Sequence, residues 1–380
     1  MPAKQKIKTI AKVENPNAFK YWISEALIKR MGKSIAAVYP QFDQKLFLKC
    51  ATRLGPLELK DRVRMIREQL HDILPAQYPQ ALKILLASVR LKSLSGFDLW
   101  PYSDFVQTYG LVNVELSLKA LREMNMVFSS EFAVRPFILQ HPKTTMDFLL
   151  ANADDSSVDV RRWTSEGTRP RLPWGEKLGP FIADPTPTLP ILEKLKFDEE
   201  LYVRKSVSNH LNDIAKDHPE VVLRLLARWS KEADERHAAK IEWIIHRSLR
   251  SLIKAGNPGA LKLIGADHGV KLAVKHLSLQ KKTFKLNEKI EFNFTVHSLA
   301  KKPQKIVIDY IIHHMKSNKE TSPKVFKLKT LTLAPGERVD ILKKHPLKLI
   351  TTRKYYPGRH GLEIQINGKV YSAVEWNLKI

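Results

Sequence analysis

The stretch Ile290-Glu291-Phe292-Asn293-Phe294-Thr295-Val296-His297 decides the fold of the C-terminal part of this chain, because every second side chain in it is apolar. A period of two is typical of a β-strand that buries one face. A second alternating run spans residues 370–378, directly after Asn367-Gly368, and this dipeptide between apolar runs is a strong hairpin signal. Ala334-Pro335-Gly336-Glu337 indicates another turn. Several short strands of this kind predict a sandwich of immunoglobulin type.

Before Gly269 the apolar residues follow the period of a helix instead. Residues 81–87 and 221–227 carry them at helical spacing, and Pro, Gly and Asp-Ser clusters separate such runs at short intervals. His-Pro and Val-Arg pairs recur early in the amphipathic segments, which is a weak repeat signal. Irregular helical pairs of this kind predict a HEAT-like solenoid. We therefore expect an all-α HEAT-like helical solenoid over residues 1–269, followed by an all-β immunoglobulin-like sandwich over residues 270–380.

The chain is strongly basic, with 64 Lys and Arg against 39 Asp and Glu and a net charge of +25 at pH 7. The excess is densest from Lys271 onward, where 23 basic residues accompany 8 acidic ones. Such a charge predicts a polyanionic partner, and nucleic acid fits it better than a membrane surface. Apolar residues make up 43% of the chain, which is enough for packed cores and excludes global disorder.

Cysteine and histidine usage limits the chemistry. Cys50 is the single cysteine, so the chain forms neither an internal disulfide nor a cysteine-based zinc site, and a reducing compartment is indicated. No pair of histidines has metal-ligand spacing, so we expect neither a metal nor a cofactor. The N-terminus is basic without a following apolar run of signal-peptide length, and no stretch approaches the ~20 apolar residues of a membrane span. We expect a cytoplasmic protein without a membrane partner.

Three stretches combine acids, arginines and aromatic residues. They are residues 129–137, 160–175 and 202–213, which read SSEFAVRPF, VRRWTSEGTRPRLPWG and YVRKSVSNHLND. In the second stretch two prolines stiffen a loop whose guanidinium groups suit phosphate and whose indole suits a base or sugar. A carboxylate beside them repels a phosphate backbone, so Glu166 indicates chemistry on a cationic nucleic-acid target.

These stretches, together with the basic β-domain, resemble the AlkC branch of the HEAT-like DNA alkylation repair glycosylases. The strings SEFAVRPF, SEGTRPRLPW and VRKSVSNHLNDIAKDHP carry the resemblance, which covers most of the chain. It implies a monofunctional DNA glycosylase that hydrolyses the N-glycosidic bond of 3-methyladenine and 3-methylcytosine and so starts base excision repair. It also implies access to the lesion without base flipping, unlike most glycosylases. We expect a nucleoid-associated monomer that binds double-stranded DNA containing alkylated bases, without an obligate protein partner.

The resemblance places the catalytic cleft at Glu131, Glu166, Trp174 and Asp213. The chemistry agrees, because a base methylated at N3 is cationic and leaves without a strong general acid. Carboxylates then stabilise the oxocarbenium-like sugar and direct water at the anomeric carbon. We expect Trp174, and with it Trp163, to contact the lesion. The DNA backbone is expected to be held by Arg135, Arg161, Arg162, Arg169, Arg171, Arg204, Lys205, Lys301, Lys302, Arg353, Lys354 and Arg359.

Each acid also has a plainer interpretation. Glu131 follows two serines and fits the first turn of a capped helix, and Glu166 fits a solvated last turn. Asp213 lies near a predicted helix end, where it can pair with a neighbouring lysine, and the tryptophans can serve in packing. One rival function is a non-enzymatic helical-repeat scaffold that binds nucleic acid or an acidic protein. The other is a glycosylase that flips the base into a deep pocket.

Overall fold

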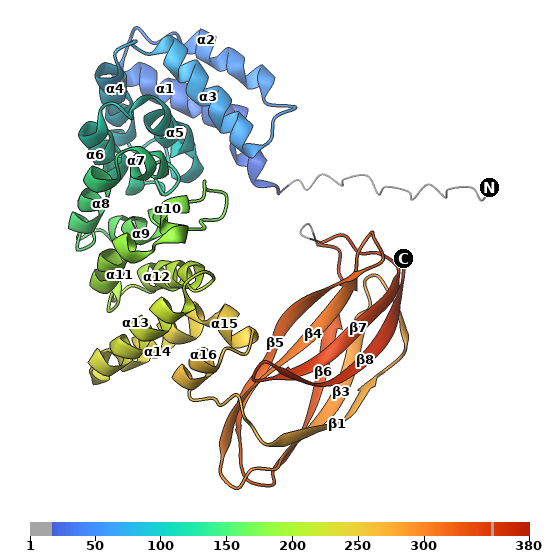
Figure 1. The fold of residues 1–380 in the computed structure, drawn as a ribbon. Helices are drawn as coiled ribbons and strands as arrows, with labels where there is room; N and C mark the ends of the chain where they lie inside the picture. The colour runs from blue at the N-terminus through green and yellow to red at the C-terminus, as the bar shows by residue number, and fades with distance from the viewer. Residues whose placement is uncertain (1–16, 351–352) are drawn as a thin grey trace. The chain divides into compact units, whose positions relative to one another are not determined.

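The computed structural model describes residues 17–350 and 353–380 of the chain, and the chain divides into two compact units, Met1–His210 and Leu211–Ile380. Within the described residues, the first unit consists of helices and turns, and the second combines helices with two β-sheets (Figure 1). None of the helices in these ranges combines the length and the apolar character of a membrane span. The predicted order of a helical solenoid followed by an immunoglobulin-like sandwich is confirmed.

The first unit is a succession of short helices joined by turns. Several carry a proline in their first turn, because a proline there lacks only an amide hydrogen that has no partner. In chain order the elements are η1 (Phe19–Trp22), α1 (Glu25–Val38), α2 (Gln44–Lys49), η2 (Cys50–Arg53), α3 (Leu59–Ile73), α4 (Tyr78–Arg90), η3 (Gly96–Leu99), α5 (Trp100–Tyr109), α6 (Val114–Asn125), α7 (Arg135–Gln140), α8 (Pro142–Ala151), α9 (Val158–Gly167), α10 (Gly179–Ala183), η4 (Thr186–Thr188), α11 (Leu189–Leu195) and α12 (Leu201–Ile214).

The helices of the first unit bury apolar stripes against their neighbours. In α1, Leu27, Met31 and Ile35 are fully buried and lie one turn apart. Burying such a side chain contributes roughly 1.5–3 kcal/mol, so the stripes rather than intrinsic propensity stabilise these short helices. Large aromatic side chains fill the interior: Trp100, Tyr102, Phe105, Phe137 and Trp163.

In the second unit, helices precede the sandwich. They are α13 (Pro219–Glu232), α14 (Glu235–Ser248), α15 (Arg250–Lys254) and α16 (Pro258–Leu263). The strands are β1 (Leu272–Leu279), β2 (Thr283–Lys285), β3 (Lys289–Ser298), β4 (Gln304–Met315), β5 (Thr321–Leu333), β6 (Arg338–Pro346), β7 (Gly358–Ile366) and β8 (Lys369–Lys379). One sheet has the order β1-β3-β6 and the other the order β2-β8-β7-β4-β5. Neighbouring strands are antiparallel except β2 and β8, which are parallel.

Strand β3 shows how the alternating pattern builds the sandwich. Ile290, Phe292, Phe294 and Val296 are buried in the core cluster, whereas the residues that alternate with them are partly or fully exposed. Strands β7 and β8 are joined at Asn367-Gly368, with φ of +47° and +81° at the two residues. Both angles lie in the left-handed region that a two-residue hairpin turn requires, so the turn predicted from this dipeptide is present.

The helices α13–α16 belong with the sandwich in one compact unit. The side chain of Gln365 donates to the carbonyl oxygen of Lys254 at 2.7 Å, and Lys254 Nζ donates to the carbonyl oxygen of Val325 at 3.3 Å. Gly256 lies so close to the β7–β8 turn that a Cβ on it would be 2.7 Å from the Cα of Gly368. The division predicted at 269/270 therefore marks the change from helices to strands, while the compact units divide within α12.

Candidate active site

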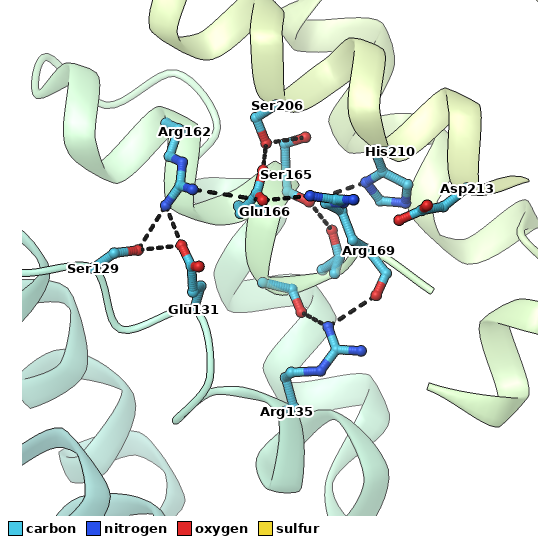
Figure 2. Close-up of polar contacts among 12 residues, drawn as sticks. Ser129, Glu131, Arg135, Arg162, Ser165, Glu166, Arg169, Ser206, His210 and Asp213 are labelled. Carbon is cyan, nitrogen blue, oxygen red and sulfur yellow. Dashed lines mark hydrogen bonds and ion pairs between the residues drawn. The ribbon is translucent and has the colours of Figure 1, made fainter. Parts of the chain in front are cut away.

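Glu131 lies in the turn before α7 and not in the first turn of a helix, which corrects the plainer interpretation. The Ser129 hydroxyl donates to its Oε2 at 2.7 Å. Arg162 of α9 donates through Nη1 to the same carboxylate oxygen and, at 2.7 Å, to Ser129 Oγ (Figure 2). The side chain of Glu131 is 14% exposed, so this carboxylate is fixed in place and still reaches solvent.

Glu166 occupies the last turn of α9 but is only 5% exposed, which corrects its interpretation as a solvated residue. Its Oε1 accepts from Arg169 Nη1 at 2.6 Å and lies 3.5 Å from Arg162 Nη2. Its Oε2 accepts from the Ser206 hydroxyl of α12 at 2.6 Å. Figure 2 shows the carboxylate between these donors. Both oxygens of Glu166 are therefore engaged within the protein.

Arg162 connects the two acids. Burial alone lowers the pKa of its guanidinium, but the negative charges of Glu131 and Glu166 raise it, and the net shift is upward. The guanidinium also lies over the ring of Tyr202, 5.1 Å from the ring centroid. A planar guanidinium with several donors suits this bridging position, which a lysine ammonium would not reproduce. The result is an alternating array of carboxylate, guanidinium and carboxylate whose geometry is set before any substrate binds.

One face of α12 carries three polar residues, Ser206, His210 and Asp213, at helical positions i, i+4 and i+7. Ser206 donates to Glu166, and His210 donates through Nδ1 to the carbonyl oxygen of Ser165 at 3.0 Å. Burial, and secondarily the charge of Arg169, lowers the pKa of His210 to about 3. The ring is therefore neutral at physiological pH, and within the described residues its Nε2 has no hydrogen-bond partner.

Asp213 follows on the same helix face and is only 2% exposed. Its Oδ1 accepts from Lys216 Nζ at 3.0 Å, which is the lysine pair that the plainer interpretation predicts. The side chain of Lys216 is 46% exposed, whereas that of Asp213 is 3% exposed. The burial of Asp213 nevertheless distinguishes it from an ordinary solvated helix-end acid.

Trp174 is held in an unusual backbone conformation. Its φ of +64° lies in the left-handed region, which non-glycine residues seldom adopt and which concentrates at functional sites. Lys60 Nζ of α3 donates to its carbonyl oxygen, and its indole packs edge-on against Phe19, with ring centroids 5.7 Å apart. The indole is 52% exposed, so Trp174 is presented to solvent at the tip of the loop.

Beside Trp174 lies a cleft of about 300 Å³ that sequence reasoning missed. Helix α3 contributes Lys60, Arg64 and Arg67, spaced so that they share one face of the helix. The cleft is also lined by aromatic and acidic residues, namely Trp100, Phe132, Trp174, Asp104 and Glu176. The sequence signal for this cleft is the basic stripe along α3. From the sequence alone that stripe looks like a solvated helix face, because nothing shows that the loop carrying Trp174 lies beside it.

Arg135 is fully buried and holds the loop after α9. It donates to the carbonyl oxygens of Gly167 at 2.9 Å, Arg169 at 2.8 Å and Glu176 at 2.6 Å. Its expected contact with DNA phosphate is therefore corrected. Arg135 satisfies backbone acceptors that would otherwise be buried without partners, and so fixes the loop that carries Trp174.

Arg161 and Arg204 also bind the chain itself. Arg161 makes two bonds to the Asp198 carboxylate, at 2.6 and 3.2 Å, and one to the carbonyl oxygen of Asp155 at 2.9 Å. Arg204 donates to the carbonyl oxygens of Asp198 and Glu199, each at 2.7 Å. The structure places these donors on the turn before α12 and, for Arg161, on the turn before α9, so it does not support the predicted phosphate contacts of the two arginines.

Trp163 is the clearest correction among the aromatic residues. It is fully buried and packs edge-on against Phe148, with ring centroids 6.5 Å apart, so it supports α9 and does not contact a lesion. Arg169 is likewise buried, the side chain of Arg162 is 14% exposed, and both arginines pair with the acids. Arg171 is half-buried and Lys205 is exposed, and their contacts with DNA remain predictions.

In the β-sandwich, Lys301 and Lys302 are exposed in the turn between β3 and β4. Lys354 is exposed and lies over the ring of Tyr356. Arg359, whose side chain is 71% exposed, pairs across β7 and β8 with Glu375, and Arg353 contacts His314. The contacts of both arginines with DNA remain predictions. No group of three or more potential metal ligands occurs within residues 17–350 and 353–380.

The chain is similar to known proteins over its helical part and its sandwich. Residues 273–380 match the family model described as the C-terminal Ig-like domain of the uncharacterised protein YhaZ. The chain is 38% identical to the uncharacterized protein YhaZ of Bacillus subtilis (strain 168), over 93% of this chain and 98% of that protein. It is 40% identical to the Pseudomonas fluorescens alkylpurine DNA glycosylase AlkC, solved bound to DNA containing an abasic site analog, with a TM-score of 0.89 over 96% of this chain and 100% of that one. The chain therefore belongs to the AlkC family of alkylpurine DNA glycosylases.

Proposed function

We propose that this protein is a monofunctional DNA glycosylase that releases 3-methyladenine and 3-methylcytosine from duplex DNA. The carrying observation is the fixed pair of acids, Glu131 and Glu166, bridged by Arg162 in a chain 40% identical to an alkylpurine DNA glycosylase over its full length. A scaffold that only binds nucleic acid needs no carboxylate that is fixed by an arginine and still reaches solvent, as that of Glu131 does. The alkylated-base glycosylase activity follows from the family, and the two named bases are our proposal.

The reaction is a hydrolysis. The bond between the sugar C1′ and the base nitrogen breaks, its electron pair neutralises the cationic base, and water adds to C1′ and loses a proton. Glu131 suits the face of the oxocarbenium-like sugar, because its carboxylate is fixed through Oε2 and still reaches solvent. Asp213 is proposed to orient the water, and Glu166 to hold the Arg162 guanidinium that positions Glu131.

We further propose that the lesion is reached without entering a pocket. The cleft beside Trp174 is lined by neither Glu131 nor Glu166. A base inserted into this cleft would therefore not contact either acid. The exposed indole of Trp174 is instead proposed to lie against the cationic base or its sugar, a contact worth roughly 0.5–2 kcal/mol. This arrangement favours access from the minor-groove side, where N3 of adenine lies.

Base release tests the proposal directly. The protein is incubated with methylated duplex DNA in the presence of a chelator, and the released bases are identified by chromatography. Release of 3-methyladenine and 3-methylcytosine is expected, with 7-methylguanine a poor substrate because its methyl group projects into the major groove. Comparable release of 7-methylguanine would contradict the non-flipping proposal, and DNA binding without any release would favour the scaffold.

The basic sandwich is proposed to add to the grip on DNA, with the protein acting as a cytoplasmic monomer. Lys301 and Lys302 are the exposed pair best placed to test this. The double change Lys301→Gln and Lys302→Gln is expected to lower the slope of log affinity against log salt by about 1.8, since each phosphate contact contributes about 0.9. Lys281→Gln is the matched control, because Lys281 is paired with Glu288 at 2.8 Å. An unchanged slope in the double variant would show that this turn does not touch DNA.

A further inference from the structure

Exposed aromatic rings continue from Trp174 along the surface of the first unit. Trp22 is 51% exposed, Phe19 46% and Trp174 52%. Phe19 lies between the two indoles, with ring centroids 5.1 Å from Trp22 and 5.7 Å from Trp174 and both contacts edge-on. We call these three residues the aromatic row. Large aromatic side chains are mostly buried, so three adjacent exposed rings indicate an interaction surface.

The aromatic row is rigidly supported from below. Phe97 of η3 stacks on Phe19, with centroids 6.1 Å apart and planes 7° from parallel, and contacts Trp22 edge-on at 4.6 Å. Phe97 in turn contacts the buried Trp100 at 5.7 Å. The rings are thus held in place by the interior of the unit, so little conformational freedom is lost when a ligand stacks on them.

Cationic side chains border the aromatic row at its Trp174 end. Lys60 is exposed and donates to the Trp174 carbonyl, and Arg64, one turn further along α3, has a side chain 58% exposed. The ion pair of Arg64 with Asp61 measures 3.3 Å, and both partners are more than half exposed. An exposed pair of this kind is weak, so Arg64 is able to exchange the carboxylate for a phosphate. The surface therefore combines the exposed rings of the aromatic row with the positively charged side chains of Lys60 and Arg64.

We propose that the aromatic row is a binding site for an unpaired DNA strand, with bases stacked on Trp174, Phe19 and Trp22 and phosphates beside Lys60 and Arg64. Aromatic rings beside cations are the recurring solution for single strands, because every base has a π face and every linkage a negative charge. A paired base keeps its faces covered by its neighbours, so Phe19 and Trp22 are expected to favour unpaired over duplex DNA. The inference rests on the proposed function only in taking DNA as the ligand.

The test uses the full chain and a fluorescently labelled, unmethylated oligothymidine, whose binding is followed by anisotropy. Trp22→Ala and Phe19→Ala are each expected to weaken binding about 5- to 150-fold, the range that loss of one base–aromatic stack produces. Trp22→Phe retains a π face and is expected to retain most of the affinity, whereas Trp22→Leu keeps apolar bulk alone and is expected to behave like Trp22→Ala. Leu116→Ala, at an exposed apolar residue of α6, is the matched control and is expected to bind like the unchanged protein.

Two outcomes overturn the inference. Affinity for oligothymidine that is unchanged in both Trp22→Ala and Phe19→Ala removes the aromatic row from the binding site. Equal binding by Trp22→Leu and Trp22→Phe shows that apolar area and not stacking matters, which points to a protein partner instead. Excision from methylated duplex is measured in parallel, so the two proposals fail separately. Absent excision with intact single-strand binding refutes only the glycosylase, and intact excision with unaltered strand binding in the variants refutes only the aromatic row.

Discussion

Replacing Glu166 by glutamine is expected to destabilise the first unit strongly. The carboxylate accepts bonds from Arg169 and Ser206, each at 2.6 Å, and lies 3.5 Å from Arg162. The amide keeps the shape but removes the charge, so two buried guanidinium groups lose the acid that they share. Breaking a buried ion pair in this way costs about 3–5 kcal/mol. In a unit of this size each kcal/mol lowers the melting temperature by about 2–4 °C, so a fall of about 6–20 °C follows.

Thermal melts of the full chain followed by circular dichroism measure this fall in the first unfolding transition. Glu131→Gln is the comparison, because that carboxylate is more exposed, at 14%, and accepts the hydrogen bonds from Ser129 and Arg162 on one oxygen, Oε2. We expect Glu131→Gln to lower the melting temperature by less than half as much. A melting temperature of Glu166→Gln within about 2 °C of the unchanged protein would refute the role of Glu166 as the shared counter-ion. Equal losses in the two variants would refute the division of roles between them.

Three further outcomes test the site and the second unit. Glu131→Gln and Asp213→Asn are each expected to slow single-turnover release of 3-methyladenine by roughly 10²-fold or more, the scale of electrostatic stabilisation by one group, and undiminished release by the double variant would remove the proposed site. Gly368→Ala is expected to lower the melting temperature of the second unit far more than Gly336→Ala, because both glycines have positive φ but only Gly368 lies against another backbone segment, and equal losses would contradict this reasoning. Because burial lowers the pKa of His210 from 6.5 to about 3, the unfolded chain takes up a proton first as the pH falls, so stability that is complete above pH 6.5 is lost progressively towards pH 3. Urea unfolding at pH 7 and pH 5 is expected to show ~2 kcal/mol more loss in the unchanged protein than in His210→Gln, and identical losses would reject this assignment.

The sequence predicts the strands best. The alternation at residues 290–296 places one set of side chains in the core, and a shift of one residue would expose all of them, so pattern alone determines which face is buried. The turn at Asn367-Gly368 is equally local, because its residue types are those that tolerate positive φ. By contrast, the packing of α13–α16 with the sandwich depends on the close approach of Gly256 to that turn. Nothing near Gly256 in the sequence indicates what it meets.

The arginines are where sequence reasoning is least successful. Arg135 and Arg204 read as phosphate ligands because a guanidinium that binds carbonyl oxygens and one that awaits a phosphate have the same sequence. What separates them is the position of unpaired backbone acceptors, which exists only in the folded chain. The loop after α9 ends a helix and contains two prolines, so it leaves carbonyl groups that need donors, and Arg135 supplies them.

The arginines of the first unit fall into two sets with one consequence. Arg135, Arg161 and Arg204 bind backbone carbonyls or a structural carboxylate and hold the segments in place, whereas Arg162 and Arg169 bind the acids of the site. Electrostatic catalysis requires charges that are fixed before the substrate arrives, because reorganising them during reaction would consume the stabilisation that they provide. Negative charge also has to persist in a protein of net charge +25 that approaches a polyanion. Guanidinium groups paired with the carboxylates both fix the position of the negative charge and keep the acids ionised. This explains why Arg162 and Arg169, which the sequence assigns to DNA, bind the acids of the site instead.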